Sequence, residues 1–279
     1  MPWNLIGHEW AADLLQQHIA NQEMRHAYLF AGPSGVGRKT LALRFAQGVN
    51  CTHPPRPGEP CLECRMCKQI EALQQADLTV VQSEREGGDI IIDQIRGLQQ
   101  SLSLMPYEAN FRVALLLRFH EANDNAANAL LKTLEEAPRR VILLLTADSP
   151  DDLLPTITSR CEVLRLRPLS IAATQEHLQK QWSIPPEQAE LLAHVSGGRL
   201  GYAVRLSKDA DLLKKRSGSL NDLLYLMDRP LRERFVYAEK AKAKNNTREE
   251  REKVRAELRQ DFTHWMSLWR DVQLRAAGS

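Results

Sequence analysis

The stretch Gly32-Pro-Ser-Gly-Val-Gly-Arg-Lys-Thr40 lies between a short apolar run, Ala27–Ala31, and a helical pattern that continues through Leu41–Ala46. A strand, a glycine-rich loop and a helix in this order form the setting of a phosphate-binding loop, or P-loop. Gly32 and Gly37 have the separation that the pattern G-x-x-x-x-G-K-[ST] requires. The stretch therefore predicts an α/β domain built around a P-loop.

The side chains after the glycines depart from those of a working P-loop. Arg38 replaces the lysine that reaches the terminal phosphates, and Lys39 replaces the hydroxyl that binds Mg²⁺. A register shifted by one residue would make Lys39 and Thr40 the functional pair, but it would move the ammonium away from the phosphates. We therefore expect a loop that keeps its shape without binding ATP and Mg²⁺ productively, and the shifted register remains the alternative. The cofactor-binding positions concerned are Gly32, Gly35, Gly37, Arg38, Lys39 and Thr40.

A second position of P-loop chemistry is also altered. The run Arg112–Leu117 predicts a strand, and in P-loop ATPases this strand ends in acidic residues that hold Mg²⁺ and polarise the attacking water. Leu117 and Arg118 stand there instead, and neither side chain can ligate a cation. Glu121 follows three residues later, and we interpret it as a surface or capping residue rather than a displaced catalytic base.

Four of the five cysteines lie close together in the sequence, with the spacing C-x9-C-x2-C-x2-C over Cys51, Cys61, Cys64 and Cys67. In a reducing compartment such a cluster predicts metal ligation rather than disulfides. Four thiolates suit a structural Zn²⁺ site with no open position, and an iron–sulfur cluster is the alternative. The segment is rich in proline, so the metal would supply its order. We expect the fifth cysteine, Cys161, to be a small buried residue.

Composition narrows the class of protein. The chain has 279 residues and a formal net charge of +2, which is too small to argue for nucleic-acid binding by itself. It has no apolar run that would cross a membrane and no signal sequence at its start. We therefore expect a cytoplasmic protein without a membrane partner.

The order of patterns predicts three domains. Residues 1–166 alternate helices with apolar strands and form an α/β domain with a parallel sheet, carrying the four-cysteine zinc module at residues 51–67. Residues 167–208 form a small helical lid, and residues 209–279 a charged helical domain. Within the first domain, Asp93 is positioned to cap a helix that runs to Leu102. In the last domain Trp265 and Trp269 form a packing stripe.

Longer motifs carry a family resemblance. Asn128–Glu136, Thr158-Ser-Arg-Cys161, His26–Phe30 before the P-loop and the four-cysteine insertion after it resemble the AAA+ subunits of the bacterial DNA polymerase III clamp loader, over about residues 5–205. The family has an ATP-hydrolysing gamma/tau branch and a non-hydrolysing delta-prime branch. The resemblance implies that active subunits carry a nucleotide-sensing Arg where this chain has Gly201. Together with the altered P-loop and strand end, Gly201 favours the delta-prime branch.

The resemblance also implies roles and partners. Arg160, within the motif Ser159-Arg-Cys161, would be an arginine finger that reaches the ATP of a neighbouring subunit. The chain would assemble with gamma/tau and delta subunits in a hetero-pentamer that loads the sliding clamp onto primer–template DNA. The helix near Ile92 and Asp93, with Arg96, would be a candidate DNA contact, and residues 209–279 would form an incomplete oligomerisation collar. A catalytically active gamma/tau-type ATPase and a zinc-stabilised DNA-binding module are the alternatives.

Overall fold

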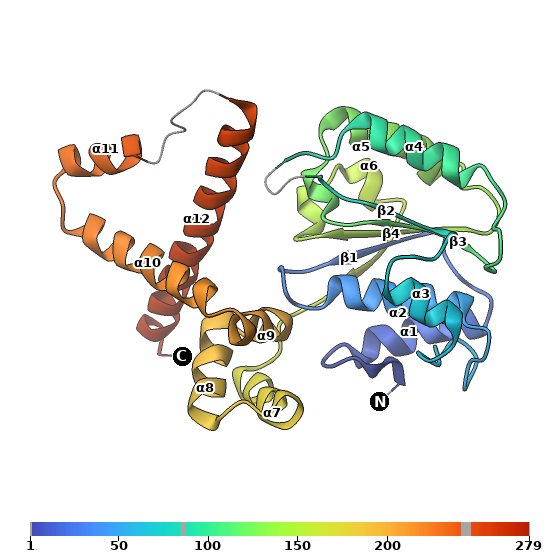
Figure 1. Cartoon of the computed structure of the whole chain (residues 1–279), viewed down its shortest axis with the longest axis horizontal. Helices are drawn as coiled ribbons and strands as arrows, with labels where there is room; N and C mark the ends of the chain where they lie inside the picture. Colours follow the sequence, from blue (N-terminus) through green and yellow to red (C-terminus); the bar gives the residue numbers. More distant parts are fainter. Residues whose placement is uncertain (1, 85–87, 241–246, 279) are drawn as a thin grey trace. The chain divides into compact units, whose positions relative to one another are not determined.

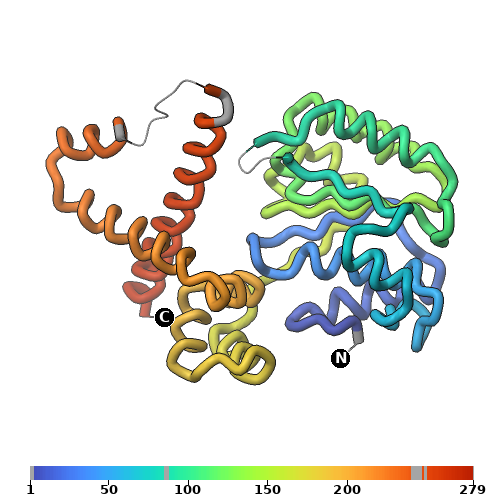
Figure 2. The backbone as a smooth tube through the Cα atoms, in the orientation of Figure 1, coloured from blue at the N-terminus to red at the C-terminus, as the bar shows by residue number. Residues whose placement is uncertain are grey.

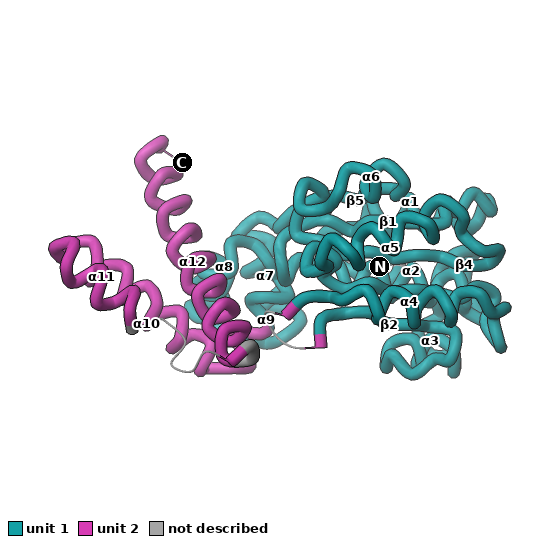
Figure 3. The backbone as a smooth tube through the Cα atoms, turned by 90° about the horizontal axis from the view of Figure 1, so that it is seen from above, with its two compact units in different colours: residues 1–83, 89–204 teal, residues 84–88, 205–279 magenta. Residues whose placement is uncertain are grey.

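The computed structural model describes residues 2–84, 88–240 and 247–278. The chain divides into two compact units, of which the first comprises Met1–Ser83 with Asp89–Val204 and the second Glu84–Gly88 with Arg205–Ser279 (Figure 3). In the ranges that the structure describes, none of the helices combines the length and the apolar character needed to span a bilayer. The chain divides into two units where we predicted three domains, so the three-domain division stays a prediction.

The first unit contains a sheet of five parallel strands in the order β2-β3-β4-β1-β5 (Figure 1). The predicted parallel sheet is therefore confirmed. All residues of the three central strands are buried, as their uninterrupted apolar sequences indicated. The strands are β1 (Ala27–Ala31), β2 (Leu78–Val81), β3 (Arg112–Leu116), β4 (Val141–Ala147) and β5 (Glu162–Arg165).

Helices cover both faces of this sheet (Figure 1). Successive side chains of β4 point to opposite faces, so Leu144 packs in the core on one side and Leu143 in the core on the other. The first face is covered by α1 (Glu9–Ala20), α2 (Arg38–Asn50) and α3 (Arg65–Glu71), and the second by α4 (Ile92–Leu102), α5 (Asp124–Glu135) and α6 (Pro155–Thr158). Strands β1 and β4 are parallel neighbours, and β1 leads directly into the P-loop. The carboxyl ends of both strands therefore lie beside this loop.

The prediction that Asp93 caps a helix was wrong. Ile90 forms a parallel bridge with Ala122, which keeps the chain extended up to Ile91. Helix α4 therefore begins at Ile92, and Asp93 lies in its first turn. The backbone N–H of Ile91 donates to Gln94 Oε1 at 3.0 Å, so a glutamine supplies the helix-start contact.

The chain is helical after β5. Helices α7 (Ile171–Trp182) and α8 (Pro186–Ser196) pack together, and α9 (Leu200–Lys208) crosses the limit between the two units. The second unit contains α10 (Ala210–Met227), α11 (Leu231–Lys240) and α12 (Arg248–Ala276), with α10 against α12 (Figure 2). Trp265 donates its Nε1–H to the Ser219 carbonyl at 2.8 Å, whereas Trp269 is 46% exposed. The predicted packing stripe therefore holds for Trp265 only.

Candidate functional sites

The P-loop backbone has the conformation that its glycines allow. Gly32, Gly35 and Gly37 have φ values of 152°, 86° and 113°, which side chains rarely tolerate. A Cβ atom on Gly32 would lie 2.4 Å from the carbonyl oxygen of Leu166. The loop keeps its glycine-dependent shape although the side chains after it differ.

An ion pair holds the first of these side chains. Arg38 is 7% exposed, and its Nη1 lies 2.6 Å from Oδ1 of Asp148, the residue directly after β4. Lys39 and Thr40, the pair of the alternative register, are exposed. The cation at the position of the phosphate-binding lysine thus has a carboxylate of the same chain as its counterion, and an incoming phosphate would meet that negative charge as well.

The start of α9 lies directly against the P-loop. The backbone N–H of Gly201 donates to the Gly35 carbonyl at 2.9 Å. A Cβ atom on Gly201 would lie 2.9 Å from that same oxygen, and one on Gly35 would lie 2.7 Å from Cβ of Tyr202. The guanidinium of Arg199 stacks on the Tyr202 ring at 4.6 Å and donates to the Ser196 carbonyl. The P-loop backbone fills the space that a side chain at position 201 would need. The Arg199 guanidinium is held by Ser196 and Tyr202, which lie close to it in the sequence.

A cleft of about 310 Å³ adjoins this contact. It is lined by the N-terminal segment, the P-loop and the helices α7 and α9, including Leu5, Thr40, Trp182 and Gly201. His8 also lines it; this residue is 3% exposed and donates its Nε2–H to the Val36 carbonyl at 2.9 Å. Sequence reasoning did not single out His8, because a histidine before a helix gives no signal of a contact 28 residues away.

The end of β3 is occupied by a second guanidinium. Leu117 is 7% exposed, and Arg118 has a left-handed φ of 50°. The backbone N–H of Arg118 donates to Thr146 Oγ1 at 2.8 Å, and its Nε donates to both carboxylate oxygens of Glu121 at 3.0 Å. The Glu121 side chain is only 13% exposed. It is the partner of Arg118 and not the surface residue we expected, because the 3-10 turn Phe119–Glu121 folds it back.

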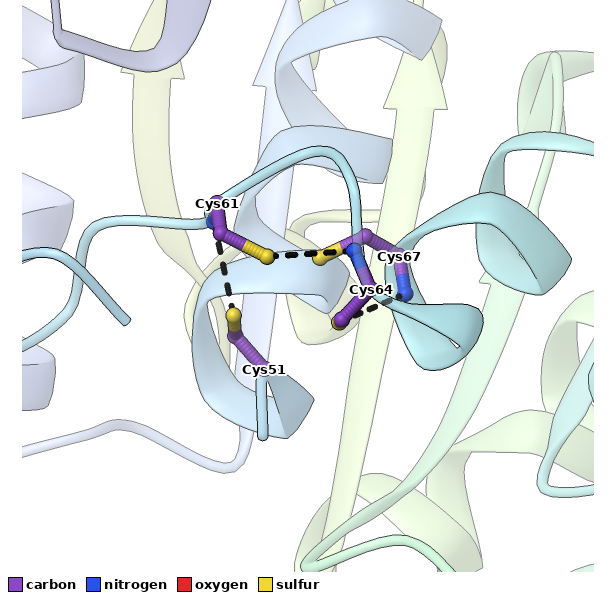
Figure 4. A group of neighbouring side chains, drawn as sticks. All are labelled: Cys51, Cys61, Cys64 and Cys67. Atoms are coloured by element: carbon purple, nitrogen blue, oxygen red, sulfur yellow. Dashed lines mark hydrogen bonds between the residues drawn. The ribbon is translucent and has the colours of Figure 1, made fainter. Parts of the chain in front are cut away.

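The four clustered cysteines converge on one point (Figure 4). Their sulfur atoms all lie within 4.8 Å of one another, which is compatible with a tetrahedron of about 2.3 Å metal–sulfur bonds. Backbone N–H groups of Cys61, Cys64 and Cys67 donate to the sulfurs of Cys51, Cys61 and Cys64 at 3.3–3.4 Å. These bonds orient the sulfurs as the outer shell of a metal site does. Helix α3, which we did not predict, begins directly after Cys64.

In the absence of a cation, the pKa of one of these thiols is lowered and the pKa values of two are raised. Burial raises the pKa of Cys64, but hydrogen bonds from the backbone of Cys67 and from Thr52 outweigh it and bring the pKa to about 6. Burial raises the pKa values of Cys51 and Cys67, and a divalent cation would reverse this effect. His53 bonds to Thr52 Oγ1 and leaves the set entirely sulfur. The four residues could hold a metal ion, and their donor chemistry suits zinc.

Arg160 projects from the end of α6. Its Nη1 donates to the Thr156 carbonyl at 2.9 Å, and its Nη2 donates to Glu135 Oε1 at 2.6 Å. The Ser159 hydroxyl also donates to the Thr156 carbonyl. Cys161 is half-buried against the second core rather than fully buried, and burial raises the pKa of its thiol to about 12. Arg160 is thus a partly exposed cation whose guanidinium is held by the Thr156 carbonyl and by Glu135.

The candidate DNA-contact helix is less distinctive. Arg96 Nη1 lies 3.3 Å from Asp93 Oδ1, and both side chains are largely exposed. A DNA contact at this helix stays a prediction. Asp148 and Glu135, the partners of Arg38 and Arg160, escaped sequence reasoning although Asp148 directly follows a strand, where ligand-binding side chains of parallel sheets gather.

Comparison with known proteins fits this fold and these motifs. The family described as "DNA polymerase III, delta subunit" matches residues 7–170. This chain belongs to that family of clamp-loader subunits. The P-loop, the cysteine module and Arg160 all lie in the matched range, so they belong to the part of the chain that this family shares.

Individual relatives are subunits delta' and tau of DNA polymerase III. The chain is 35% identical over 204 residues to DNA polymerase III subunit delta' of Bacillus subtilis and 37% identical over 201 residues to that of Pseudomonas aeruginosa. These matches cover 73% and 71% of this chain and 60% of each relative. DNA polymerase III subunit tau of Bacillus subtilis is 31% identical over 221 residues, covering 76% of this chain and 38% of the relative.

Among solved structures, a DNA polymerase III gamma subunit-related protein from Thermotoga maritima matches with a TM-score of 0.47 and 20% identity. The match covers 77% of this chain and 62% of that one.

Proposed function

We propose that this chain is a delta-prime-like, non-hydrolysing subunit of the bacterial DNA polymerase III clamp loader. It supplies Arg160 in trans to the ATP of a neighbouring gamma/tau subunit. An arginine finger stabilises charge that develops on the transferred phosphoryl group, and supplying one in trans raises hydrolysis by about 10³–10⁵-fold. The chain itself contributes a structural framework and the Arg160 side chain to the complex.

One observation carries the non-hydrolysing half of the proposal. Arg38 is buried and paired with Asp148 at 2.6 Å, while Lys39 and Thr40 are exposed. In an active P-loop the equivalent cation is free to bind phosphate. Here that cation is buried and has a carboxylate of the same chain as its counterion, which supports an inactive loop, and the exposed Lys39 and Thr40 keep the shifted register as the alternative.

Two further features support the same assignment. Leu117 and Arg118 provide no Mg²⁺ ligand at the end of β3, and Glu121 is engaged by Arg118. Gly201 offers no side chain to a nucleotide, and its backbone contacts Gly35. Sequence identity does not separate the branches, because tau relatives match at 31% and delta' relatives at 35%. The altered residues therefore carry the distinction.

The proposed partners are gamma/tau and delta subunits in a hetero-pentamer, together with the sliding clamp and primer–template DNA. The second unit would serve as the collar through which subunits associate. Its three helices expose large apolar side chains, which is typical of a surface that a partner covers. They include Leu231, Phe235, Phe262, Met266 and Trp269, which are 46–72% exposed. Zn²⁺ at the four cysteines would be structural.

Turnover by the isolated chain tests the first half of the proposal. We expect no Mg²⁺-dependent ATP hydrolysis by the purified chain, measured as phosphate release at saturating ATP. Steady hydrolysis that disappears on Lys39→Ala would establish the shifted register and the gamma/tau-type alternative. Tight binding of the isolated chain to duplex DNA, with a steep dependence on salt, would instead support a DNA-binding module.

A further inference from the structure

Glu135 contacts the guanidinium that the proposed function depends on. Helix α5 ends at Glu135, and its Oε1 accepts a hydrogen bond from Arg160 Nη2 at 2.6 Å. We propose that Glu135 is the positioning residue of the arginine finger: it fixes the orientation in which Arg160 meets a neighbouring subunit's nucleotide. This inference rests on the proposed role of Arg160 and adds a second residue to it.

The contacts hold one side of the guanidinium and leave the other available. Nη1 is bound to the Thr156 carbonyl and Nη2 to Glu135. An arginine has five N–H donors in a rigid planar fork, so these two bonds fix the plane and leave three donors over. No bond from Nε of Arg160 is present in the part of the chain that the structure describes. The remaining donors can therefore bind phosphate oxygens while the anchored ones stay in place.

The exposure of the pair argues for orientation rather than for stability. The Arg160 and Glu135 side chains are 35% and 52% exposed. Ion pairs in such surroundings contribute little to folding, so removing the carboxylate should leave the fold intact. An unanchored arginine would instead lose its rotamer freedom when it meets the nucleotide. The bond to Glu135 already restricts the rotamers of Arg160 before it meets the nucleotide. The effect of Glu135 should therefore appear in the rate of ATP hydrolysis.

The chain provides a matched control in the next residue. Glu136 has the same charge, is exposed, and its side chain forms no ion pair in the described part of the chain. Glu135→Gln and Glu136→Gln change the net charge equally, and only the first removes the charge of the carboxylate that Arg160 contacts. A difference between them therefore reports the contact and not the local field.

The experiment uses the full chain assembled with an ATP-hydrolysing gamma/tau-type subunit, and measures kcat and KM for ATP. We expect Glu135→Gln to lower kcat about 10-fold with KM unchanged, since small misplacements of a catalytic group cost up to about 100-fold. Glu136→Gln should match wild type. In an Arg160→Ala background, Glu135→Gln should have no further effect. Thermal unfolding of each variant verifies that it is folded.

The outcomes separate the two proposals. If Arg160→Ala leaves kcat unchanged, the finger itself is refuted and the proposed function fails. If Arg160→Ala lowers kcat but Glu135→Gln does not, the finger stands and Glu135 does not position it. A 10-fold loss that persists in the Arg160→Ala background, or a rise in kcat on Glu135→Gln, would equally overturn the positioning role.

Discussion

Arg38 and Arg160 carry the same functional group into opposite surroundings. Arg38 is buried and has Asp148 as its counterion, whereas Arg160 is one-third exposed and anchored on one side. Both guanidinium groups are paired with a carboxylate, but burial leaves Arg38 little accessible surface for a ligand, whereas Arg160 keeps exposed N–H donors. Arg38 thus lies at the P-loop with its counterion beside it, whereas Arg160 lies just after α6, outside that loop.

A third guanidinium holds the start of β3 in the core. Arg112 Nη2 donates to Asp77 Oδ1 at 3.0 Å, and both side chains are at most 8% exposed. The Asp77 carboxylate also accepts bonds from the backbone N–H groups of Tyr107, Glu108 and Ala109. This carboxylate thus fixes the loop that leads from α4 to β3.

Substitution of Asp77 should therefore be costly. We expect Asp77→Asn to lower the free energy of unfolding by about 3 kcal/mol, because it leaves Arg112 buried without its counterion. Asp93→Asn, which removes an exposed pair, should change it by less than about 0.5 kcal/mol. Urea unfolding of the two variants measures both values. Equal midpoints would show that the Asp77 contacts do not stabilise the fold.

The same group predicts a dependence on pH. Burial raises the pKa of Asp77, but the three backbone hydrogen bonds outweigh it and hold the pKa below its usual value. A carboxyl whose pKa is lower in the folded state stabilises the fold fully above its unfolded pKa of about 3.9. The stabilisation is lost as the pH falls through the folded pKa. The difference in stability between wild type and Asp77→Asn should therefore shrink below about pH 4, as urea unfolding at several pH values measures.

At the scale of elements, the contact between α9 and the P-loop depends on two glycines. A Cβ atom on Gly201 would lie 2.9 Å from the Gly35 carbonyl, whereas one on Gly97 in α4 would meet nothing within 4 Å. We expect Gly201→Ala to destabilise the first unit by about 2 kcal/mol through this overlap. Gly97→Ala should stabilise it by about 0.5–1 kcal/mol, because alanine favours helix. Thermal unfolding measures both values. An unchanged stability of Gly201→Ala would show that the contact adjusts to the added methyl group without destabilising the unit.

The cysteine module is the second element with a direct test. We expect one zinc per chain by elemental analysis, loss of that metal on Cys64→Ser, and its retention on Cys161→Ser, since Cys161 does not belong to the cluster. Removal of zinc by a chelator should expose the segment 51–67 to proteolysis, because we expect the metal to supply its order. Iron in place of zinc would establish the alternative cluster, and a metal-free chain of unchanged protease resistance would refute the structural role.

The elements differ in how far the sequence predicts them. The central strands were predictable because strands buried on both faces are uninterrupted apolar runs. Strand β5 was not, since it lies at the sheet edge and begins and ends with Glu162 and Arg165. The four sulfurs were predictable from spacing alone. The pairs Arg38–Asp148 and Arg160–Glu135 were not, because each joins segments that only the folded sheet brings together.

At the scale of the molecule, the chain covers 60% of the length of the delta' relatives that it matches. Its first unit contains the P-loop, the cysteine module and Arg160, and its second unit is helical with many exposed apolar side chains. We expect the second unit to drive association, so that Phe235→Ser with Met266→Ser weakens binding to a gamma/tau-type subunit at least about 10-fold, since large apolar side chains dominate interfaces. Sedimentation measures this affinity, and unchanged binding would exclude these helices as the collar.

We infer that this chain acts on ATP held by another subunit. The most direct test measures steady-state ATP hydrolysis by an active gamma/tau-type subunit mixed with the wild-type chain or with Arg160→Ala. We expect that the wild-type chain stimulates hydrolysis and that Arg160→Ala abolishes most of that stimulation, by about 10³-fold or more if one finger has its usual effect, without weakening assembly. Equal stimulation by the two chains would contradict it.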